Sequence, residues 1–196
     1  MAAPAVRRSV RSPQPPEGFR VEADFLTADA ERELLDRIAP LPFKQFEFHG
    51  YLGLRRVVSF GWSYRYDERR LQAAPPIPPF LRPLRVRAAG FAGLPPETFT
   101  QSLVAEYRPG APIGWHRDKP EFEDVVGISL LSSCTLRFRR RIESGWERWS
   151  HEAEPRSIYL LRGPVRSQWE HSIPPVESLR YSITFRSLRR ERRPPR

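Results

Sequence analysis

A chain of 196 residues is long enough for one domain with a substantial hydrophobic core. Its hydrophobic content of 39%, with 5 Trp, 6 Tyr and 12 Phe, excludes an intrinsically disordered protein. The 33 Lys and Arg residues outnumber the 23 Asp and Glu, which gives a net charge of +10, and nearly all of the cations are arginines.

This charge favours a polyanionic partner, because the arginine guanidinium binds phosphate through paired hydrogen bonds and stacks on bases. A general bias of the chain toward Arg, Ala and Pro explains the same composition equally well. The single cysteine, Cys134, excludes an intramolecular disulfide and a cysteine-rich zinc site. No apolar run approaches the ~20 residues that cross a bilayer, and the N-terminus lacks the apolar segment of a signal peptide. We therefore expect a cytoplasmic monomer without a membrane partner.

The two ends of the chain differ in composition from its middle. Residues 1–18 are rich in Pro and Arg and are expected to form a disordered arm, and residues 189–196 form a basic tail. The folded domain is therefore expected over residues 19–188. Its first helix is predicted over residues 26–39, with Thr27 as the N-cap.

A second helix is predicted to start near residues 78–79 and to end at Gly90 or Gly93, with Pro83 in its first turn. From residue 99 onward, polar and apolar side chains alternate with the period of two that is typical of strands. The alternating segments cover residues 100–107, 126–131, 135–140, 157–161 and 180–186. Two helices followed by many short strands indicate an α+β protein whose core is an antiparallel double-sheet barrel or jelly roll.

The stretch GWHRDKP carries two side chains of metal-binding type two residues apart. In an extended segment, His116 and Asp118 point to the same face. His171 lies on a late segment that can return beside the first, whereas His49 and His151 are not well placed. Two histidines and one carboxylate can occupy three positions around Fe(II) and leave the others open for reactants.

The segment RYSITFR, residues 180–186, separates its polar and apolar side chains onto opposite faces of a strand. Its polar face consists of Arg180, Ser182, Thr184 and Arg186. If the apolar face packs against helices, the polar face points into the barrel, where an unpaired guanidinium is costly. An anionic ligand is therefore expected there, and a dicarboxylate that also chelates iron meets this requirement.

Together these residues resemble the pattern of the AlkB family of Fe(II)- and 2-oxoglutarate-dependent dioxygenases. The family pattern is H-x-D, a distal H, and then R-x-N-x-T-x-R, and Tyr107 matches the last position of an upstream N-x-Y. The resemblance covers approximately residues 20–188. It implies a double-stranded β-helix (jelly roll) core, with the N-terminal helices packed on one sheet and a lid hairpin at about residues 45–67.

The resemblance also implies roles for individual residues. His116, Asp118 and His171 would hold Fe(II) and form the catalytic centre. Arg180 would bind the distal carboxylate of the co-substrate 2-oxoglutarate, with Tyr107 at the same end. The full set of implied co-substrate residues is Tyr107, Arg180, Ser182, Thr184 and Arg186. With O₂ as the other reactant, such an enzyme hydroxylates a C–H bond, and a hydroxylated N-methyl group releases formaldehyde.

Three positions depart from the family pattern. Ala105 and Ser182 each stand where the family has Asn, which removes or alters two amide contacts to the co-substrate. Pro120 stands where nucleic-acid demethylases often carry Asp or Glu, a role that Glu121 or Glu123 can take over.

In the lid region, Phe60, Trp62 and Tyr64 alternate beside Arg55 and Arg56. Aromatic and arginine side chains in this arrangement suit a base-stacking wall with phosphate contacts. The same pattern also suits a hairpin whose aromatic side chains pack on the core.

A second basic and aromatic segment, LRFRRRIESGWERW, places Arg137 and Arg139 on one strand face, and a solvated hairpin explains it equally well. Three functions remain open. The favoured one is demethylation of N-alkylated bases in DNA or RNA, of the alkylation-repair or RNA-modification type. The second is a dioxygenase of the same fold that acts on a protein or small molecule, which Pro120 and Ala105 suggest. The third is a non-catalytic nucleic-acid-binding domain, against which the complete set of iron ligands argues.

Overall fold

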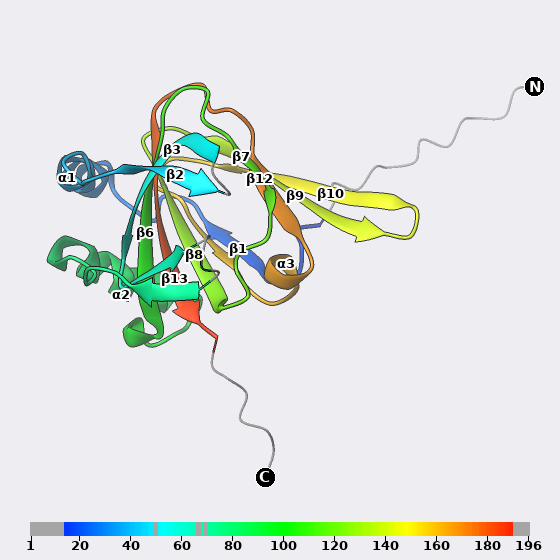
Figure 1. Cartoon of the computed structure of the whole chain (residues 1–196), viewed down its shortest axis with the longest axis horizontal. Helices are drawn as coiled ribbons and strands as arrows, with labels where there is room; N and C mark the ends of the chain where they lie inside the picture. The colour runs from blue at the N-terminus through cyan, green and yellow to red at the C-terminus, as the bar shows by residue number, and fades with distance from the viewer. Residues whose placement is uncertain (1–13, 49–50, 66–67, 69, 190–196) are drawn as a thin grey trace, which may run out of the picture.

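Two antiparallel β-sheets form the core of the molecule, and two helices cover the outer face of the larger sheet (Figure 1). The structure is a computed structural model and describes residues 14–48, 51–65, 68 and 70–189. Most of the expected N-terminal arm and basic tail, and His49, lie outside the described residues. None of the helices in the described part combines the length and the apolar character needed to cross a membrane.

The larger sheet has seven strands in the order β1-β11-β8-β13-β6-β3-β2. These strands are β1 (Phe19–Glu22), β2 (Lys44–Phe48), β3 (Tyr51–Phe60), β6 (Phe99–Tyr107), β8 (Phe122–Leu130), β11 (Ile158–Leu161) and β13 (Arg180–Leu188). The smaller sheet has the order β10-β9-β12-β7, from β7 (Ile113–His116), β9 (Cys134–Ile142), β10 (Gly145–Ala153) and β12 (Glu170–Ile173). A separate ribbon pairs β4 (Trp62–Arg65) with β5 (Arg70–Ala73). The predicted antiparallel double-sheet core is confirmed.

Both predicted helices are present. The first is α1 (Ala28–Ile38), and Thr27 caps it by accepting a hydrogen bond from the Ala30 amide at 3.2 Å. The second begins with the short 3-10 turn η1 (Pro79–Leu81) and continues as α2 (Arg82–Ala92), which ends at Gly93 with a φ of 66°. Pro83 falls in the first turn of α2, where its missing amide hydrogen costs no helical hydrogen bond. Two further short elements are η2 (Pro96–Thr98) and α3 (Pro164–Ser167).

The alternation of β13 decides what each of its faces contacts, because this strand lies between β6 and β8. Tyr181, Ile183 and Phe185 pack in the cluster that includes the buried side chains of α1 and α2. Ile183 and Phe185 are fully buried, and each such side chain contributes about 1.5–3 kcal/mol by leaving water. The polar side chains of β13 therefore point between the two sheets, as predicted.

Several four-residue strands escaped prediction, namely β1, β5, β7 and β12. They escaped because four-residue strands such as EHSI are too short to show a period of two. β10 pairs with β9 along its whole length as a hairpin, so it gains its strand conformation from a partner rather than from its own hydrophobic pattern.

The lid region divides into two structures. β2 and β3 extend the edge of the larger sheet beside β6, whereas the β4–β5 ribbon leaves that sheet. Gly61 separates the two with a φ of 75°, and a Cβ atom there would lie 2.0 Å from the carbonyl oxygen of Thr100. Only glycine fits this close approach. The turn interrupts the alternation of aromatic residues on which the lid prediction was based.

Candidate active site

The small sheet brings two histidines together. β12 pairs with β7 so that His171 lies directly opposite His116, and the centroids of their rings are 4.3 Å apart. Asp118 follows β7 by two residues, and one ligand atom from each of the three side chains lies within 4.8 Å of the others. Three atoms so placed have a common centre at most about 2.8 Å from each, so a small inward movement would bring them to the ~2.0–2.2 Å of a metal–ligand bond.

The Asp118 carboxylate is held ionised inside the protein. Burial works to raise its pKa, but the positive charge of Arg186, followed by the two histidines, lowers the pKa to about 2. Arg186 Nη2 donates to Asp118 Oδ1 at 3.4 Å. The other oxygen, Oδ2, is buried and has no hydrogen-bond partner among the described residues. A buried anionic oxygen without a donor is costly, and a divalent cation would supply the missing partner.

The two imidazoles also suit a metal. Burial and the neighbouring His116 lower the pKa of His171 to about 3, so its ring is neutral at neutral pH and offers a lone pair. His116 Nδ1 lies 2.9 Å from the carbonyl oxygen of Gly114. This contact is suited to a ring that donates from Nδ1 and leaves Nε2 as the ligand atom. The donor set of two neutral imidazoles and one carboxylate therefore fits Fe(II).

Arg180 lies between the sheets with none of its surface exposed. Its Nε donates to Ser129 Oγ at 3.2 Å, and its guanidinium carbon lies 4.8 Å from the centroid of the Tyr107 ring. Both terminal nitrogens, Nη1 and Nη2, are buried without a hydrogen-bond partner in the described part of the chain. These two nitrogens form the planar fork that binds a carboxylate, so both are available to donate hydrogen bonds to an acidic ligand.

Polar side chains from neighbouring strands surround Arg180. Tyr107 lies opposite Arg180 in the β6–β13 pairing, and Ser182 and Thr184 follow on the same face of β13. Burial works to raise the pKa of Tyr107, but the charges of Arg55 and Arg180 hold that pKa below its ordinary value. The region is therefore electropositive, as a site for a dicarboxylate needs to be.

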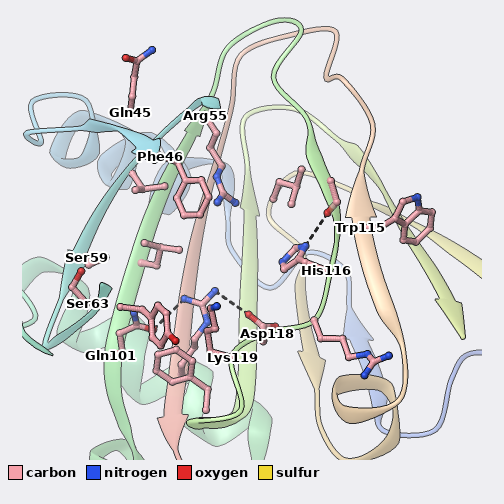
Figure 2. A pocket seen from close by; sticks show the side chains of 18 residues that line it. Gln45, Phe46, Arg55, Ser59, Ser63, Gln101, Trp115, His116, Asp118 and Lys119 are labelled. Atoms are coloured by element: carbon pink, nitrogen blue, oxygen red, sulfur yellow. Dashed lines mark hydrogen bonds and ion pairs between the residues drawn. The ribbon is translucent and has the colours of Figure 1, made fainter. Parts of the chain in front are cut away.

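Arg186 connects this region to the three candidate metal ligands. One nitrogen of its guanidinium, Nη2, contacts Asp118, while Nη1 donates to Gln101 Oε1 at 3.1 Å. Figure 2 shows Gln101 on one side of this network and Asp118 on the other. The orientation of Asp118 is thus fixed by a residue of the central strand of the larger sheet.

A pocket of about 500 Å³ opens beside His116 and Asp118 (Figure 2). Residues of the lid region line it, among them Phe46, Arg55 and Tyr64. The guanidinium of Arg55 lies 4.3 Å from the centroid of the Phe46 ring. On the other wall, Lys119 Nζ lies 4.4 Å from the centroid of the Tyr64 ring. The pocket therefore combines flat aromatic surfaces with positive charge next to the candidate metal ligands.

The other residues predicted for the lid occupy different places. Phe60 is only 8% exposed and belongs to the hydrophobic cluster beneath the helices. Trp62 is partly buried, and its carbonyl oxygen accepts a hydrogen bond from Gln101. Arg56 binds the Glu106 carboxylate through Nε at 2.7 Å and Nη2 at 2.6 Å. These three residues do not line the pocket within the described residues.

The structure shows the surroundings of the positions that depart from the family pattern. Ala105 is buried beside Ser182 in the β6–β13 pairing and offers no hydrogen bond from its side chain. Among the described residues, neither Glu121 nor Glu123 lines the pocket. Asp118 is the one carboxylate in the described lining.

Sequence reasoning missed Ser129 and Gln101, which contact Arg180 and Arg186. Both lie on strands that were predicted, in GISLL and TQSLVAEY. Alternation along these strands would have placed them on the inner face, so the signal was present. Tyr159 was missed as well: its ring packs on Gly127, where a Cβ atom would lie 2.2 Å away, and burial raises the pKa of its hydroxyl.

Residues 18–186 match the family model described as the 2OG-Fe(II) oxygenase superfamily. The "Alkylated DNA repair protein ALKBH8 homolog" of Arabidopsis thaliana is 28% identical over 201 residues, which cover 88% of this chain and 56% of the relative. The chain thus spans about half the length of that protein.

Two solved structures are similar at low sequence identity. OsALKBH1 is 17% identical with a TM-score of 0.67, over 88% of this chain and 100% of that one. A prolyl hydroxylase from Trichoplax adhaerens, in complex with a hypoxia inducible factor oxygen degradation domain peptide fragment, is 15% identical with a TM-score of 0.63. That match covers 87% of this chain and 83% of the hydroxylase. At these identities the likeness shows the fold alone.

Proposed function

The chain belongs to the 2OG-Fe(II) oxygenase superfamily, and from this we propose that it demethylates N-alkylated bases in DNA or RNA by oxidation and releases formaldehyde. Membership of the family implies a dioxygenase that uses Fe(II), 2-oxoglutarate and O₂. The relative in Arabidopsis thaliana and the structure of OsALKBH1 support a place among the AlkB-like members. What we propose beyond family membership is the demethylase activity.

We assign His116, Asp118 and His171 as the ligands of Fe(II). Their support is the unpartnered Oδ2 of Asp118 and the neutral ring of His171, which together provide the donors that this ion prefers. When bound, iron with 2-oxoglutarate and O₂ supplies oxidation of a C–H bond while 2-oxoglutarate becomes succinate and CO₂. A hydroxylated N-methyl group then breaks its C–N bond, so that the carbon leaves as formaldehyde and the nitrogen regains its proton.

We assign Arg180 as the residue that binds the distal carboxylate of 2-oxoglutarate. The two free terminal nitrogens of its buried guanidinium support this role, with Tyr107 and Ser182 able to donate to the same carboxylate. Thr184 follows on the same inner face of β13. Arg186 would keep Asp118 oriented beside the opposite end of the co-substrate.

The observation that carries the choice of substrate is the pocket that joins Tyr64 and Arg55 to His116 and Asp118. An aromatic ring can stack on a base removed from its helix, and the positive charge suits the phosphates on either side. The ~500 Å³ volume is large enough for a nucleobase. In this proposal Tyr64 contacts the base and Arg55 a phosphate, whereas the pairing of Arg56 with Glu106 indicates a structural role.

The proposal is tested by incubating the protein with Fe(II), 2-oxoglutarate and oligonucleotides that carry single N-methylated bases. Formaldehyde and the unmethylated base should appear in equal amounts. The matched control is Asp118→Ala, which should form neither product. If the wild-type protein converts 2-oxoglutarate to succinate but leaves every methylated DNA and RNA strand intact, the family chemistry stands and the nucleic-acid substrate is wrong.

A second candidate function is hydroxylation of a protein or a small molecule. Two observations favour it: the fold likeness to the prolyl hydroxylase, and the absence of an acidic side chain at Pro120, where nucleic-acid demethylases often carry one. This function predicts succinate formation that is stimulated by peptides rather than by methylated strands. The same assay, run with both kinds of substrate, separates the two.

A further inference from the structure

The outer face of the small sheet carries four arginines on two strands. Arg137, Arg139 and Arg141 alternate along β9, and Arg148 of β10 lies directly opposite Arg139. We call these four residues the arginine track. Within the described part of the chain, Arg139 is the one member with a carboxylate partner, Glu170, at 2.7 Å. Arg141 and Arg148 are exposed.

Like charges placed directly opposite each other destabilise a sheet. The Glu170 carboxylate offsets this repulsion at Arg139, whereas Arg148 has no carboxylate partner within the described residues, so the pair keeps an excess positive charge that an anion would neutralise. A solvated surface would place the two guanidiniums apart and leave them mobile. Here Arg139 lies instead between two indoles, with its guanidinium carbon 4.3 Å from the Trp115 ring centroid and 4.2 Å from that of Trp146. This packing fixes the guanidinium in place before any ligand binds.

The arginine track begins near β7, the strand that borders the pocket, but on the outer face of the small sheet. Trp115 precedes the candidate metal ligand His116 and lines the pocket, yet it stands on the other side of the strand, as Figure 2 shows. Its indole is contacted by Arg137 at 5.2 Å and by Arg139. From there the track continues toward the end of the β9–β10 hairpin, because β12 covers only residues 137–139 of β9. The hairpin extends well beyond the rest of the molecule (Figure 1).

We propose that the arginine track binds the phosphate backbone of a single nucleic-acid strand and guides it to the pocket. Successive track arginines on β9 are two residues apart, about 6.6 Å, which is close to the spacing of phosphates along an extended strand. The surface combines rigid guanidinium groups with indole rings and has few carboxylates. Such a surface binds single-stranded nucleic acid independently of its sequence. This inference rests on the proposed function, because the bound strand is the one whose base enters the pocket.

The test compares two double variants that remove the same charge. Arg141→Gln/Arg148→Gln changes the exposed part of the track and keeps the Arg139–Glu170 pair. Arg32→Gln/Arg82→Gln is the control, because these exposed arginines lie on α1 and α2, over the other sheet. Binding of a fluorescent, unmethylated 20-nucleotide strand is followed by anisotropy at several salt concentrations, without iron or 2-oxoglutarate.

Each phosphate contact to a single strand contributes about 0.7 to the slope of log K against log salt. Loss of two contacts should lower the slope by about 1.4 and weaken binding at 0.1 M salt by roughly 10- to 30-fold. The control should bind like wild type. The melting temperature of the track variant should not fall, because it removes a like-charge pair. That of the control should fall little, because its Arg32–Asp29 pair is exposed.

Equal affinity and slope for the two variants would overturn the proposal. So would a track variant that binds nucleic acid normally but loses binding to polyglutamate, because that result would assign the surface to an acidic protein. The measurement needs no turnover, so it is independent of the demethylase assay. If the arginine track binds strands but the protein demethylates none of them, only the proposed reaction is refuted.

Discussion

Arg186 of the larger sheet holds Asp118, which follows β7 of the smaller sheet, with 3.4 Å between Nη2 and Oδ1. This contact spans the space between the two sheets and leaves Oδ2 without a donor among the described residues. Arg186 thus orients Oδ1 of Asp118, and Oδ2 remains available to bind a metal ion.

Replacing Asp118 with Ala should weaken binding of Mn(II), a stand-in for Fe(II), by at least the ~10- to 100-fold that is lost when a residue supporting a metal ligand is removed. His171→Ala should behave similarly. His151→Ala is the matched control, because His151 lies on the same sheet but stacks on Trp149. Electron paramagnetic resonance titration measures the affinity, and unchanged Mn(II) binding in Asp118→Ala would remove this residue from the metal site.

Replacing Arg180 with Lys should raise the KM for 2-oxoglutarate by roughly 10- to 150-fold, since charged hydrogen bonds contribute about 1.5–3 kcal/mol and the planar fork is lost. Mn(II) affinity should stay near that of wild type. Arg180→Met should melt at the same or a higher temperature without ligand, because it removes an unpaired buried charge. It should also lose the thermal stabilisation that 2-oxoglutarate gives the wild-type protein. A normal ligand-induced shift in Arg180→Met would place the co-substrate elsewhere.

Replacing Tyr64 with Ala should raise the KM for a methylated oligonucleotide by roughly 5- to 150-fold, because stacking of a base on an aromatic ring contributes ~1–3 kcal/mol. Turnover of 2-oxoglutarate without substrate should persist, since the metal ligands are untouched. Tyr64→Phe keeps the ring and serves as the control. Equal losses in the two variants would show that the hydroxyl, not the ring, matters.

The charge of the pocket predicts which methylated bases react. Arg55, Arg117 and Lys119 line it together with Arg186, against the single carboxylate of Asp118 in the described lining. Two unit charges ~8 Å apart interact by about 2 kcal/mol at an effective dielectric constant of 20. A neutral base such as 3-methyluracil should therefore react at least about tenfold better than the cation 1-methyladenine. Ratios of kcat/KM measure this preference, and Lys119→Glu should reduce it.

The pair of Arg56 and Glu106 should stabilise the fold in a pH-dependent way. Hydrogen bonding to Arg56 lowers the pKa of Glu106 in the folded protein. The stabilisation is therefore complete above the unfolded pKa of ~4.3 and is lost as pH falls through the lower folded value. Glu106→Gln should cost roughly 1–3 kcal/mol at pH 7. Melting temperatures of the variant and wild type should converge as pH falls below 4; a constant gap would contradict this account.

Features that depend on local chemistry could be predicted from the sequence. Thr27 and Pro83 predicted where the helices begin, because capping and proline geometry act within one turn. The alternation in RYSITFR predicted that Arg180 and Arg186 face inward, since the period of a strand is fixed by its backbone. The H-x-D pair with a distant histidine indicated a metal site from residue types and spacing alone.

The contacts between distant residues depend on the three-dimensional fold. His171 lies opposite His116 because β12 and β7 pair in one register, and a shift by one residue would turn the ring to the other face. The turn at Gly61 sends Phe60 into the core and leaves Tyr64 to line the pocket, which the alternation of aromatic residues did not reveal. The pairing of β9 with β10 likewise places Arg148 against Arg139. Strand pairing forms hydrogen bonds between distant parts of the chain, so no short segment of the sequence determines its register.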